Sequence, residues 1–416
     1  MMATGGAQGI VKGGDAERTA PEWAAWFHGT LMPWWLEQAR DTLHGGFFDR
    51  LTEDGVARAD DPKSTLVQAR LLFTLSHLYL HKRDDRLLDG AHAAHRFLTE
   101  HLRDPRDGGY VRAADRTGRP SGLATDRVKR SYDQSFVLLA LSTYQRVEPS
   151  KALADQLRDC WSFIENRLTD PETGALYEDD TFHHGGHDTG AATHALRAQN
   201  PHMHMFEALL QVYEMTGDAM WMRRAEDMLA VVRRHFIDTE NGTIIEFRAA
   251  DLSPAKGRDG SLREIGHQCE WSWLLDRYVR LGGHADALTL ADRMMGFAER
   301  FGFHPEGPMK GAAYDEVHSD GRVMTDTMLL WPQTEAGKAY VARFERLGHG
   351  ADADRAHDFM RIVFQTYFAG RKAWRNRVDG AGRTLQAEAL SRLLYHVTVF
   401  VSEGERVGLW PDRTTG

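Results

Sequence analysis

The sequence predicts an all-α protein of the (α/α)6 barrel type, a ring of six helix pairs with short β-hairpins in the connecting loops. Two observations predict it: glycine-marked, strand-like segments recur along the 416 residues, and each interval between them holds two helical segments. Self-similarity at a long, fixed period marks a repeat architecture. Six pairs fill a ring and leave no atypical capping repeat, which an open helical solenoid needs. Closure is therefore preferred, with the open solenoid as the alternative.

The strand-like segments begin roughly 60–70 residues apart. Several pair aromatic or β-branched residues with an Asp-Gly turn, which is typical of a short β-hairpin. The last segment lacks the leading glycine but keeps the aromatic residue and the turn. The segments are residues 44–55, 107–118, 173–182, 241–251, 310–323 and 372–383.

The first helix of each pair is the more apolar, and the second carries charges at every turn, as an outward-facing helix should. The sixth pair combines a C-terminal helix with an N-terminal one, so both ends of the chain meet in it. The predicted pairs are 64–81 with 89–102, 131–147 with 150–168, 201–216 with 219–236, 265–281 with 285–301, 329–347 with 351–368, and 388–405 with 22–39.

Composition excludes several classes of protein. A formal net charge of −9 argues against nucleic acid or an anionic membrane as the main partner. Cys160 and Cys269 are too few for a disulfide framework or a thiolate metal site, which points to a reducing cytoplasm. No run of about 18 apolar residues suggests a membrane span. We expect residues 1–20 to be a disordered lead-in and residues 21–416 to form a single catalytic domain.

Several predicted inner helices carry polar residues that a purely structural helix does not need. His204 precedes Glu207 by three residues, and His267 precedes Glu270 by three, which places each pair on one helix face. A carboxylate there can fix the tautomer of the imidazole and raise its basicity, as a general acid/base histidine requires. The other positions of this kind are Gln68, Arg70, Tyr132, Asp133, Gln134, Asn200, His202, Trp271, Trp273, Trp331, Gln333, Glu335, Tyr395 and His396.

A metal site is the main rival interpretation of these histidines. Residues 183–190 and His202 supply more imidazoles, and Glu-x-x-His pairs bind two metals in helical bundles. Here the order is reversed and the doubled acidic ligands of that motif are missing, so we predict no metal. A single histidine or Trp331 alone would be read as structural, but two His-x-x-Glu pairs and a third histidine on one ring favour a site. No convincing phosphate loop occurs, and no cofactor is expected.

Seven motifs follow one another in a specific order, namely HGGFF (44–48), QAR (68–70), YDQSF (132–136), NPHMHMFEA (200–208), GHQCEWSWLL (266–275), WPQTEA (331–336) and YH (395–396). Through them the chain resembles the N-acylglucosamine 2-epimerase superfamily over about residues 21–410. That superfamily includes cellobiose 2-epimerases and the mannose and sulfoquinovose aldose–ketose isomerases. The resemblance implies an (α/α)6 barrel, in agreement with the repeats. It also implies metal-independent proton transfer at the carbon next to the aldehyde.

Carried over position by position, the resemblance implies that His204, His267 and His396 are catalytic. Arg70 matches an arginine that contacts substrate oxygens, and Trp331 matches a tryptophan that lies against the sugar. We add three polar residues of the inner helices to the pocket positions that the resemblance implies. The expected substrate-binding residues are Arg70, Asn200, Glu270, Trp331, Gln134, Glu335 and Tyr132.

These residues fit an enediolate mechanism. After ring opening, a base removes the C2 proton; its return to C1 yields a ketose, and its return to the opposite face of C2 yields the epimer. We expect His267 and His396 to be the acid/base pair, and His204 to assist ring opening or bind the neighbouring hydroxyl. Arg70 would stabilise the enediolate oxygen.

We therefore expect a cytoplasmic aldose–ketose isomerase, a monomer or homodimer, that acts on D-mannose and D-fructose. A 2-epimerase of glucose/mannose, cellobiose or an N-acylglucosamine is the alternative, because the two reactions differ only in proton delivery. Loops 180–198 and 250–264 would decide between a monosaccharide and a disaccharide. An inverting glycoside hydrolase needs two carboxylates across the scissile bond, whereas histidine dominates here. A non-catalytic sugar-binding toroid would bind sugar without exchanging its C2 proton.

Overall fold

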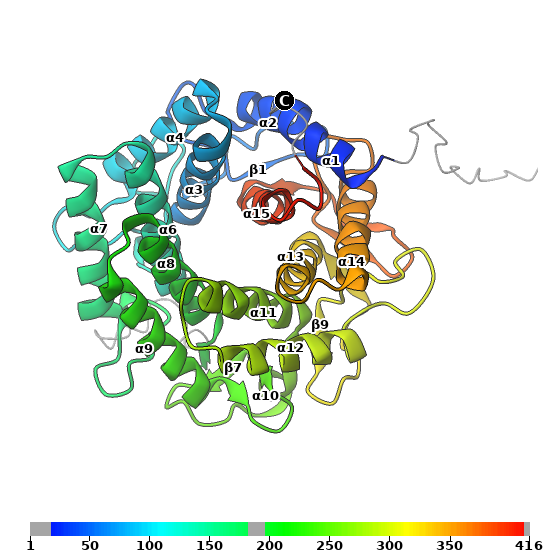
Figure 1. The fold of residues 1–416 in the computed structure, drawn as a ribbon. Helices are drawn as coiled ribbons and strands as arrows, with labels where there is room; N and C mark the ends of the chain where they lie inside the picture. Colours follow the sequence, from blue (N-terminus) through cyan, green and yellow to red (C-terminus); the bar gives the residue numbers. More distant parts are fainter. Residues whose placement is uncertain (1–17, 182–195, 412–416) are drawn as a thin grey trace, which may run out of the picture.

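The computed structural model describes residues 18–181 and 196–411, and its helices form a closed double ring (Figure 1). The predicted lead-in, 1–20, lies outside the described residues except for its last three, and helix α1 begins at Ala20. The inner helices are α3 (Thr65–Lys82), α6 (Ser131–Val147), α8 (Asn200–Thr216), α11 (Ile265–Arg280), α13 (Leu330–Leu347) and α15 (Leu394–Arg406).

The outer ring surrounds the inner helices, and four of its members contain or end in a π-helical turn. These outer helices are amphipathic, and the core fills the space between the two rings. In chain order the outer elements are α1 (Ala20–Trp26), η1 (Phe27–Leu31) and α2 (Met32–Ala39), then α4 (Asp85–Phe97) with η2 (Leu98–Leu102), α7 (Lys151–Phe163) with η3 (Ile164–Leu168), α9 (Ala219–His235), α12 (Ala287–Phe301), and α14 (Gly350–Arg361) with η5 (Ile362–Phe368). Short helices α5 (Ala124–Arg127), α10 (Gly257–Ser261) and η6 (Ser391–Leu393) lie in the connections.

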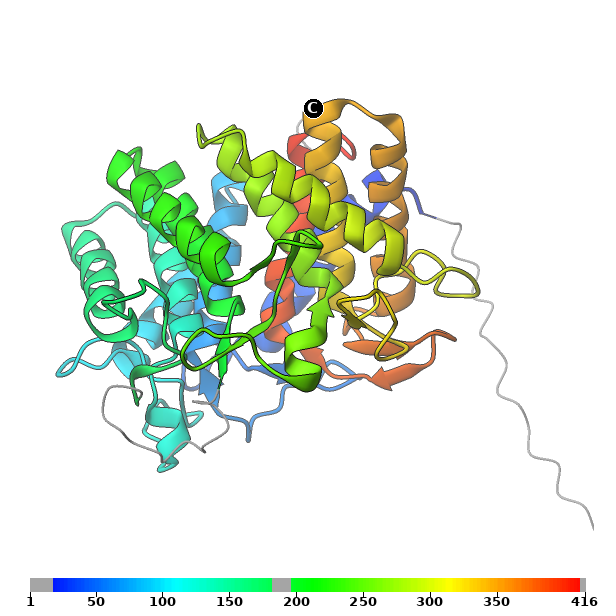
Figure 2. The same ribbon diagram turned by 90° about the horizontal axis from the view of Figure 1, so that it is seen from below.

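Short antiparallel strands gather at one end of the ring (Figure 2). Four strands that lie just before an inner helix each pair with a strand in the loop that follows the outer helix of the same pair. These pairings are β2 (Lys63–Ser64) with β3 (Ala113–Ala114), β4 (Leu196–Ala198) with β7 (Phe247–Ala249), β8 (Leu262–Glu264) with β9 (Glu316–His318), and β10 (Thr327–Leu329) with β11 (Arg377–Asp379). β5 (Ile237–Asp238) pairs with β6 (Thr243–Ile244), and β12 (Thr384–Gln386) adds to β11. The predicted hairpins are confirmed by these strands and by bridges such as Arg40–Phe47.

Contacts between the N-terminal and C-terminal parts of the chain close the ring. Strand β1 (Arg50–Leu51) pairs with β13 (Ala389–Leu390), so residues at opposite ends of the chain share one ladder. His28 of the first outer helix also lies 2.8 Å from Glu405 of α15. The closed ring is therefore confirmed and the open-solenoid alternative is wrong.

A glutamine near the start of four inner helices fixes the hairpin that packs beneath it. The amide of Gln134 accepts a hydrogen bond from the backbone N–H of Tyr110 (2.9 Å) and donates one to the Tyr110 carbonyl (2.8 Å). Gln68, Gln268 and Gln333 make the same pair of bonds to Phe47, Ile244 and Ala313. Such bonds satisfy backbone groups that would otherwise be buried without partners.

In α8 a histidine takes the place of this glutamine. His202 Nε2 accepts from the N–H of Leu176 at 2.8 Å, while Nδ1 lies 3.0 Å from the Ala198 carbonyl. Both ring nitrogens thereby have partners, so His202 supports the start of the helix and has no ring nitrogen left for a ligand. That role leaves His204 as the histidine of this helix that lines the cavity described below.

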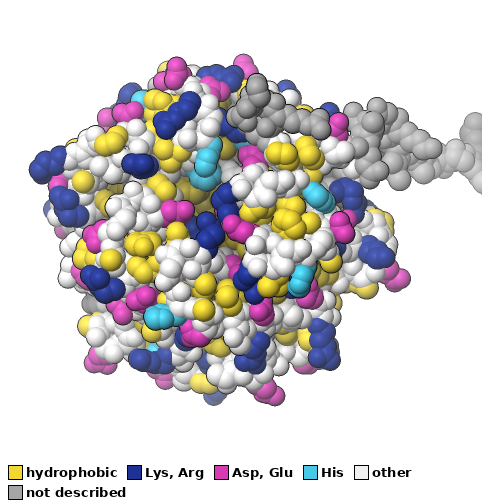
Figure 3. All heavy atoms as spheres, viewed as in Figure 1, with side chains coloured by type: hydrophobic (Ala, Val, Ile, Leu, Met, Phe, Trp, Pro, Cys, Tyr) yellow, Lys and Arg dark blue, Asp and Glu magenta, His cyan; other side chains and the backbone are white. Residues whose placement is uncertain are grey.

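Charges of both signs are mixed over the surface. On the face that Figure 3 shows, basic and acidic side chains lie next to one another around the centre of the ring. Ion pairs such as Arg277 with Glu214 and Arg346 with Asp276, both at 2.6 Å, join helices of the inner ring to their neighbours. Within residues 18–181 and 196–411, no helix is both long and apolar enough to cross a membrane. Cys160 and Cys269 are buried free thiols.

Candidate active site

A cavity of about 610 Å³ opens at the hairpin end of the ring, and every inner helix contributes to its wall. Eight of the ten expected site residues line it, namely His204, His267, His396, Arg70, Asn200, Glu270, Trp331 and Tyr132. Gln134 and Glu335 do not. Gln134 holds the Tyr110 backbone beneath the helix and does not line the cavity, which corrects the expectation that it contacts substrate.

His204 is held by the carboxylate one turn further along α8. Its Nδ1 donates to Glu207 Oε2 at 3.0 Å, as the spacing predicts, and the hydroxyl of Tyr395 donates to the other oxygen of Glu207. Burial lowers the pKa of His204 to about 4, and the bond to Glu207 only partly offsets that effect. His204 is therefore neutral at pH 7, with Nε2 as the ring nitrogen left for a ligand.

His267 has different partners from the one predicted. Its Nδ1 lies 2.8 Å from Glu246 Oε2 and 3.3 Å from Glu264 Oε2, so Glu270 is not its hydrogen-bond partner. Side chains of a helix lean toward its N-terminus. His267 lies at the start of α11 and therefore leans toward the strand before the helix, away from Glu270. Burial lowers the pKa of His267, but the charges of Glu246 and Glu264 outweigh burial and raise it to about 10.

His396 lies between the carboxylate of Glu335 and the guanidinium of Arg70. Its Nδ1 donates to Glu335 Oε1 at 2.7 Å, and Arg70 Nη1 donates to its Nε2 at 3.2 Å. Burial, together with the charges of Arg70 and Lys338, holds the pKa of His396 well below its usual value. Glu335 thus lies behind the imidazole, shielded from the cavity, which corrects the expectation that it contacts substrate.

Arg70 is almost fully buried and its described partners are neutral. Besides His396, it donates to the Tyr132 hydroxyl at 2.8 Å and to the Arg392 carbonyl at 3.2 Å. Its guanidinium carbon also lies 4.1 Å from the centre of the Phe136 ring, a cation–π distance. A guanidinium held in this way keeps its positive charge available for an anion that forms in the cavity.

Trp331 lies between two of the histidines. Its ring centroid is 4.9 Å from that of His267 and 5.9 Å from that of His396. A Cβ added to Gly266 would lie only 2.3 Å from the Trp331 ring, so a glycine is needed there for the indole to approach α11. The indole therefore provides a flat apolar surface beside two imidazoles, a suitable platform for a sugar ring.

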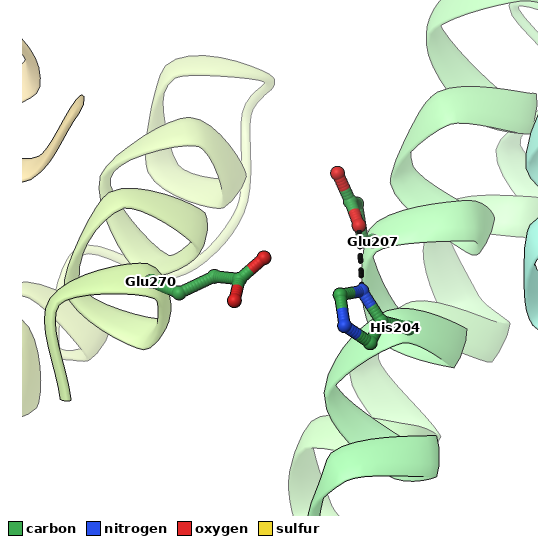
Figure 4. Close-up of side chains that lie close together, drawn as sticks. All are labelled: His204, Glu207 and Glu270. Atoms are coloured by element: carbon green, nitrogen blue, oxygen red, sulfur yellow. Dashed lines mark hydrogen bonds and ion pairs between the residues drawn. The ribbon is translucent and has the colours of Figure 1, made fainter. Parts of the chain in front are cut away.

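Three side chains of the cavity wall have buried polar atoms that lack hydrogen-bond partners among the described residues. These atoms are Arg70 Nε, Asn200 Oδ1 and both carboxylate oxygens of Glu270. Figure 4 shows Glu270 projecting from α11 toward the His204–Glu207 pair on α8. Burial and the charge of Glu335 raise the pKa of Glu270 well above its ordinary value. Buried polar groups that the protein leaves unsatisfied point to a polar ligand.

The residues that sequence reasoning missed include Glu246 and Glu264, and a repeat could have revealed the first. In four hairpins an acidic residue stands four positions after the leading glycine and accepts a bond from a backbone N–H just before an inner helix. The pairs are Asp49 with Ser64, Glu178 with Ala198, Glu246 with Glu264, and Asp315 with Leu329. Glu246 keeps this bond with one oxygen and holds His267 with the other. Arg130, Glu178, Asn376 and Arg392 also line the cavity and were not predicted.

Three groups of histidine and carboxylate side chains are close enough to share a cation, each with its ligand atoms within 4.8 Å: His204–Glu207–Glu270, Glu246–Glu264–His267 and Glu270–Glu335–His396. In each group the imidazole Nδ1 already pairs with a carboxylate. In the third group, the Lys338 ammonium lies 2.6 Å from Glu335, and Arg70 lies beside His396, so two cations oppose a metal there. We therefore assign the carboxylates that pair with the imidazoles, those of Glu207, Glu246, Glu264 and Glu335, to the orientation of the rings. The histidine-rich run 183–190 lies outside the described residues.

Comparison with known proteins adds an independent line of evidence. The family model described as N-acylglucosamine 2-epimerase (GlcNAc 2-epimerase) matches residues 46–399. The chain is 28% identical over 405 residues to the mannose-6-phosphate isomerase of Rhizobium meliloti (strain 1021), which covers 94% of this chain and 98% of that protein. It is 33% identical over 303 residues to the D-mannose isomerase of Thermobifida fusca, covering 68% and 70%. The solved cellobiose 2-epimerase of Bacillus thermoamylovorans B4167 superposes with a TM-score of 0.82 at 21% identity, covering 93% of this chain and 99% of that chain.

Proposed function

The chain belongs to the N-acylglucosamine 2-epimerase family, and from this premise we propose that it is a metal-independent aldose–ketose isomerase that interconverts D-mannose and D-fructose. Membership and the names of its relatives make it an isomerase or epimerase. The choice of an isomerase and of its sugar is our proposal. It rests on the unequal charge states of the two histidines that flank Trp331.

The observation that carries the proposal is the contrast between His267 and His396. The charges of Glu246 and Glu264 raise the pKa of His267 to about 10, whereas burial, with the charges of Arg70 and Lys338, holds the pKa of His396 well below its usual value. A neutral imidazole can remove the C2 proton, and an imidazolium can donate toward the carbonyl oxygen. An isomerase returns the proton to C1 from the same base, so both histidines regain their resting charges within each turnover.

Ring opening comes first in the proposed mechanism. His204 is neutral and presents Nε2 to the cavity, where it can accept the anomeric hydroxyl proton or bind the next hydroxyl. Asn200 and Glu270 offer unpartnered polar atoms to sugar hydroxyls, and Trp331 lies against the ring. These contacts hold the open-chain aldose with C1 and C2 between His267 and His396.

Proton transfer follows. His396 Nε2 takes the C2 proton and becomes an imidazolium, while the electrons of the C–H bond form the C1–C2 double bond of a cis-enediolate. His267 donates toward O1, and Arg70 stabilises negative charge on the enediolate. His396 then returns its proton to C1 while neutral His267 takes up the proton of the C2 hydroxyl, which gives the ketose and restores both histidines.

A 2-epimerase is the second candidate, and the position of the two imidazoles on either side of Trp331 favours it. Epimerisation requires His267 to deliver its proton to the opposite face of C2. His267 would then end neutral beside two carboxylates, and His396 would end protonated near two cations. Both states are opposed by the surrounding charges. This opposition is why we place the isomerase first.

Proton NMR in deuterated water with EDTA tests the proposal. D-mannose should give D-fructose, and fructose should carry deuterium at C1. Glucose carrying deuterium at C2 would instead establish the 2-epimerase. D-mannose 6-phosphate and cellobiose, assayed in parallel, test the substrates named for the relatives. If none of these sugars reacts or exchanges a proton, the proposed catalysis is wrong; lost activity in EDTA, restored by a divalent cation, would contradict metal independence.

The pH dependence of kcat/KM follows from the two pKa shifts. The base must be deprotonated, and the pKa of His396 lies well below its usual value, so acid should inactivate only well below neutrality. The acid must be protonated, and the pKa of His267 is about 10. We expect a plateau between about pH 7 and pH 9 and a loss of rate near pH 10. A narrow bell with an alkaline limb near pH 7.5 would contradict this assignment.

Glu246→Gln should move the alkaline limb to lower pH. The amide keeps the size of the side chain and an oxygen for the Glu264 N–H, but it removes the nearest negative charge from His267. The imidazolium then loses its proton more readily, so the rate at pH 9 should fall more than the rate at pH 7. Asp315→Asn, a change at the equivalent position of another repeat, is the matched control. An unchanged limb in Glu246→Gln would show that His267 is not the acid.

A further inference from the structure

A lysine is buried directly behind the base of the proposed mechanism. The Lys338 side chain is fully inaccessible, and its Nζ lies 2.6 Å from Glu335 Oε2. The other oxygen of Glu335 accepts from His396 Nδ1 at 2.7 Å. Lys338 Nζ also lies 3.8 Å from the centre of the Trp273 ring, a cation–π contact. Lysines are almost never fully buried unless they are paired, so this placement calls for a reason.

The surroundings of the Lys338–Glu335 pair contain more acid than base. Glu207 and His204 face the pair from α8, Glu270 from α11, and Tyr395 and His396 from α15, with Arg70 beyond His396. The Lys338 ammonium thus interacts electrostatically with three buried carboxyl groups, those of Glu207, Glu270 and Glu335. Its pKa is lowered by burial but raised more by these acids, so it stays charged.

We infer that Lys338 is a positioning residue for the base: its ammonium keeps Glu335 ionised, and ionised Glu335 holds the proton of His396 on Nδ1. Nε2 then keeps a lone pair, which accepts from Arg70 in the structure and takes the C2 proton when Arg70 turns to the substrate oxygen. This inference deepens the proposed function and rests on it. Lys338 touches neither the cavity nor the sugar. It acts only through Glu335.

The ammonium is needed because a carboxylate inside a protein is costly without a cation. Deprived of Lys338, Glu335 would lie among Glu207 and Glu270 and take up a proton. A protonated Glu335 donates to Nδ1 instead of accepting from it. The ring proton then moves to Nε2, where the base must accept the C2 proton, and the same imidazole can no longer act.

Lys338→Met tests this, because methionine fills a similar volume without charge. At pH 7 we expect kcat for C2 proton exchange to fall about 10- to 100-fold while KM changes less than about twofold. The acid limb of the kcat profile should move to higher pH, since activity now requires Glu335 to ionise unaided. An unmoved acid limb would overturn the inference.

Lys63→Met is the matched control. Lys63 is equally buried and paired, with Nζ 2.9 Å from Asp41, but it lies outside the cavity. Its loss should lower the melting temperature and leave the pH profile unchanged. A second test is Glu335→Gln: adding Lys338→Met to it should cost no further kcat, because the lysine acts only through that carboxylate. A further large loss in the double variant would contradict the inference.

Nitrogen NMR of ¹⁵N-histidine protein gives a readout that does not depend on turnover. His396, assigned by its absence in His396→Ala, should carry its proton on Nδ1 in the wild type and on Nε2 in Lys338→Met. Lys338→Gln serves if the methionine variant does not fold. The expected tautomers with no sugar turnover would overturn the proposed function alone, whereas turnover with an Nδ1 proton in every variant would overturn the inference alone.

Discussion

His396→Ala should reduce C2 proton exchange by about 10³- to 10⁴-fold, the upper range for loss of a general base. The His396 imidazole lines the cavity, with Nδ1 bonded to Glu335 and Nε2 to Arg70. No other described side chain occupies the position between those two groups, so none can replace it as the base. The measurement is loss of the C2 proton signal of the sugar in deuterated water, which detects exchange even without net conversion.

The control for that variant is His284→Ala, because His284 lies in the turn between α11 and α12 with its side chain 79% exposed. It should leave exchange unchanged. Circular dichroism must show that His396→Ala is folded, since it removes a buried side chain and leaves Glu335 with only Lys338. Exchange in folded His396→Ala at more than about a tenth of the wild-type rate would refute the assignment of His396 as the base.

Arg70→Met should lower kcat by about 10²- to 10³-fold, the effect seen when one oxyanion-stabilising donor is removed. The expected cause is loss of the positive charge that meets the enediolate, which exists only after the C2 proton has left. KM should therefore change less than kcat. Arg70→Lys should recover only part of the rate, because one ammonium cannot reach Tyr132, the Arg392 carbonyl and His396 together.

Arg233→Met is a suitable control for Arg70, since Arg233 pairs with Asp286 at 2.6 Å on the outside of the ring. Steady-state kinetics of the three variants separate binding from chemistry. If Arg70→Met raised KM strongly and left kcat intact, Arg70 would bind the sugar equally in its ground and transition states, and the enediolate role would be wrong.

The fold could be predicted from sequence because its signals are repeated. Five of the six hairpins are marked by a glycine shortly before apolar residues, and each inner helix is marked by its apolar run. Repetition averages out local ambiguity, so even the sixth hairpin, which lacks the glycine, was found. The contact between the two ends of the chain, made by β1 and β13, could be inferred only from the number of helix pairs, because neither strand has a local pattern that identifies its partner.

The site was less predictable, for a physical reason that Gln134, Glu335 and His267 share. Spacing along a helix tells which residues share a face, but not whether a neighbouring element occupies that face first. Gln134 meets a hairpin backbone, Glu335 meets His396 and Lys338, and His267 meets Glu246 from a loop 21 residues away. The His204–Glu207 pair was right because both residues come from one helix turn.

The ladder between β1 and β13 has a consequence for how the molecule comes apart. An open stack of helix pairs can fray from either end, one pair at a time. Here the first and last helix pairs are neighbours, so the ring has no free terminal pair from which fraying could begin. Opening at any one joint exposes two apolar helix faces at once, and unfolding should therefore proceed as a single event in which the site is lost together with the ring.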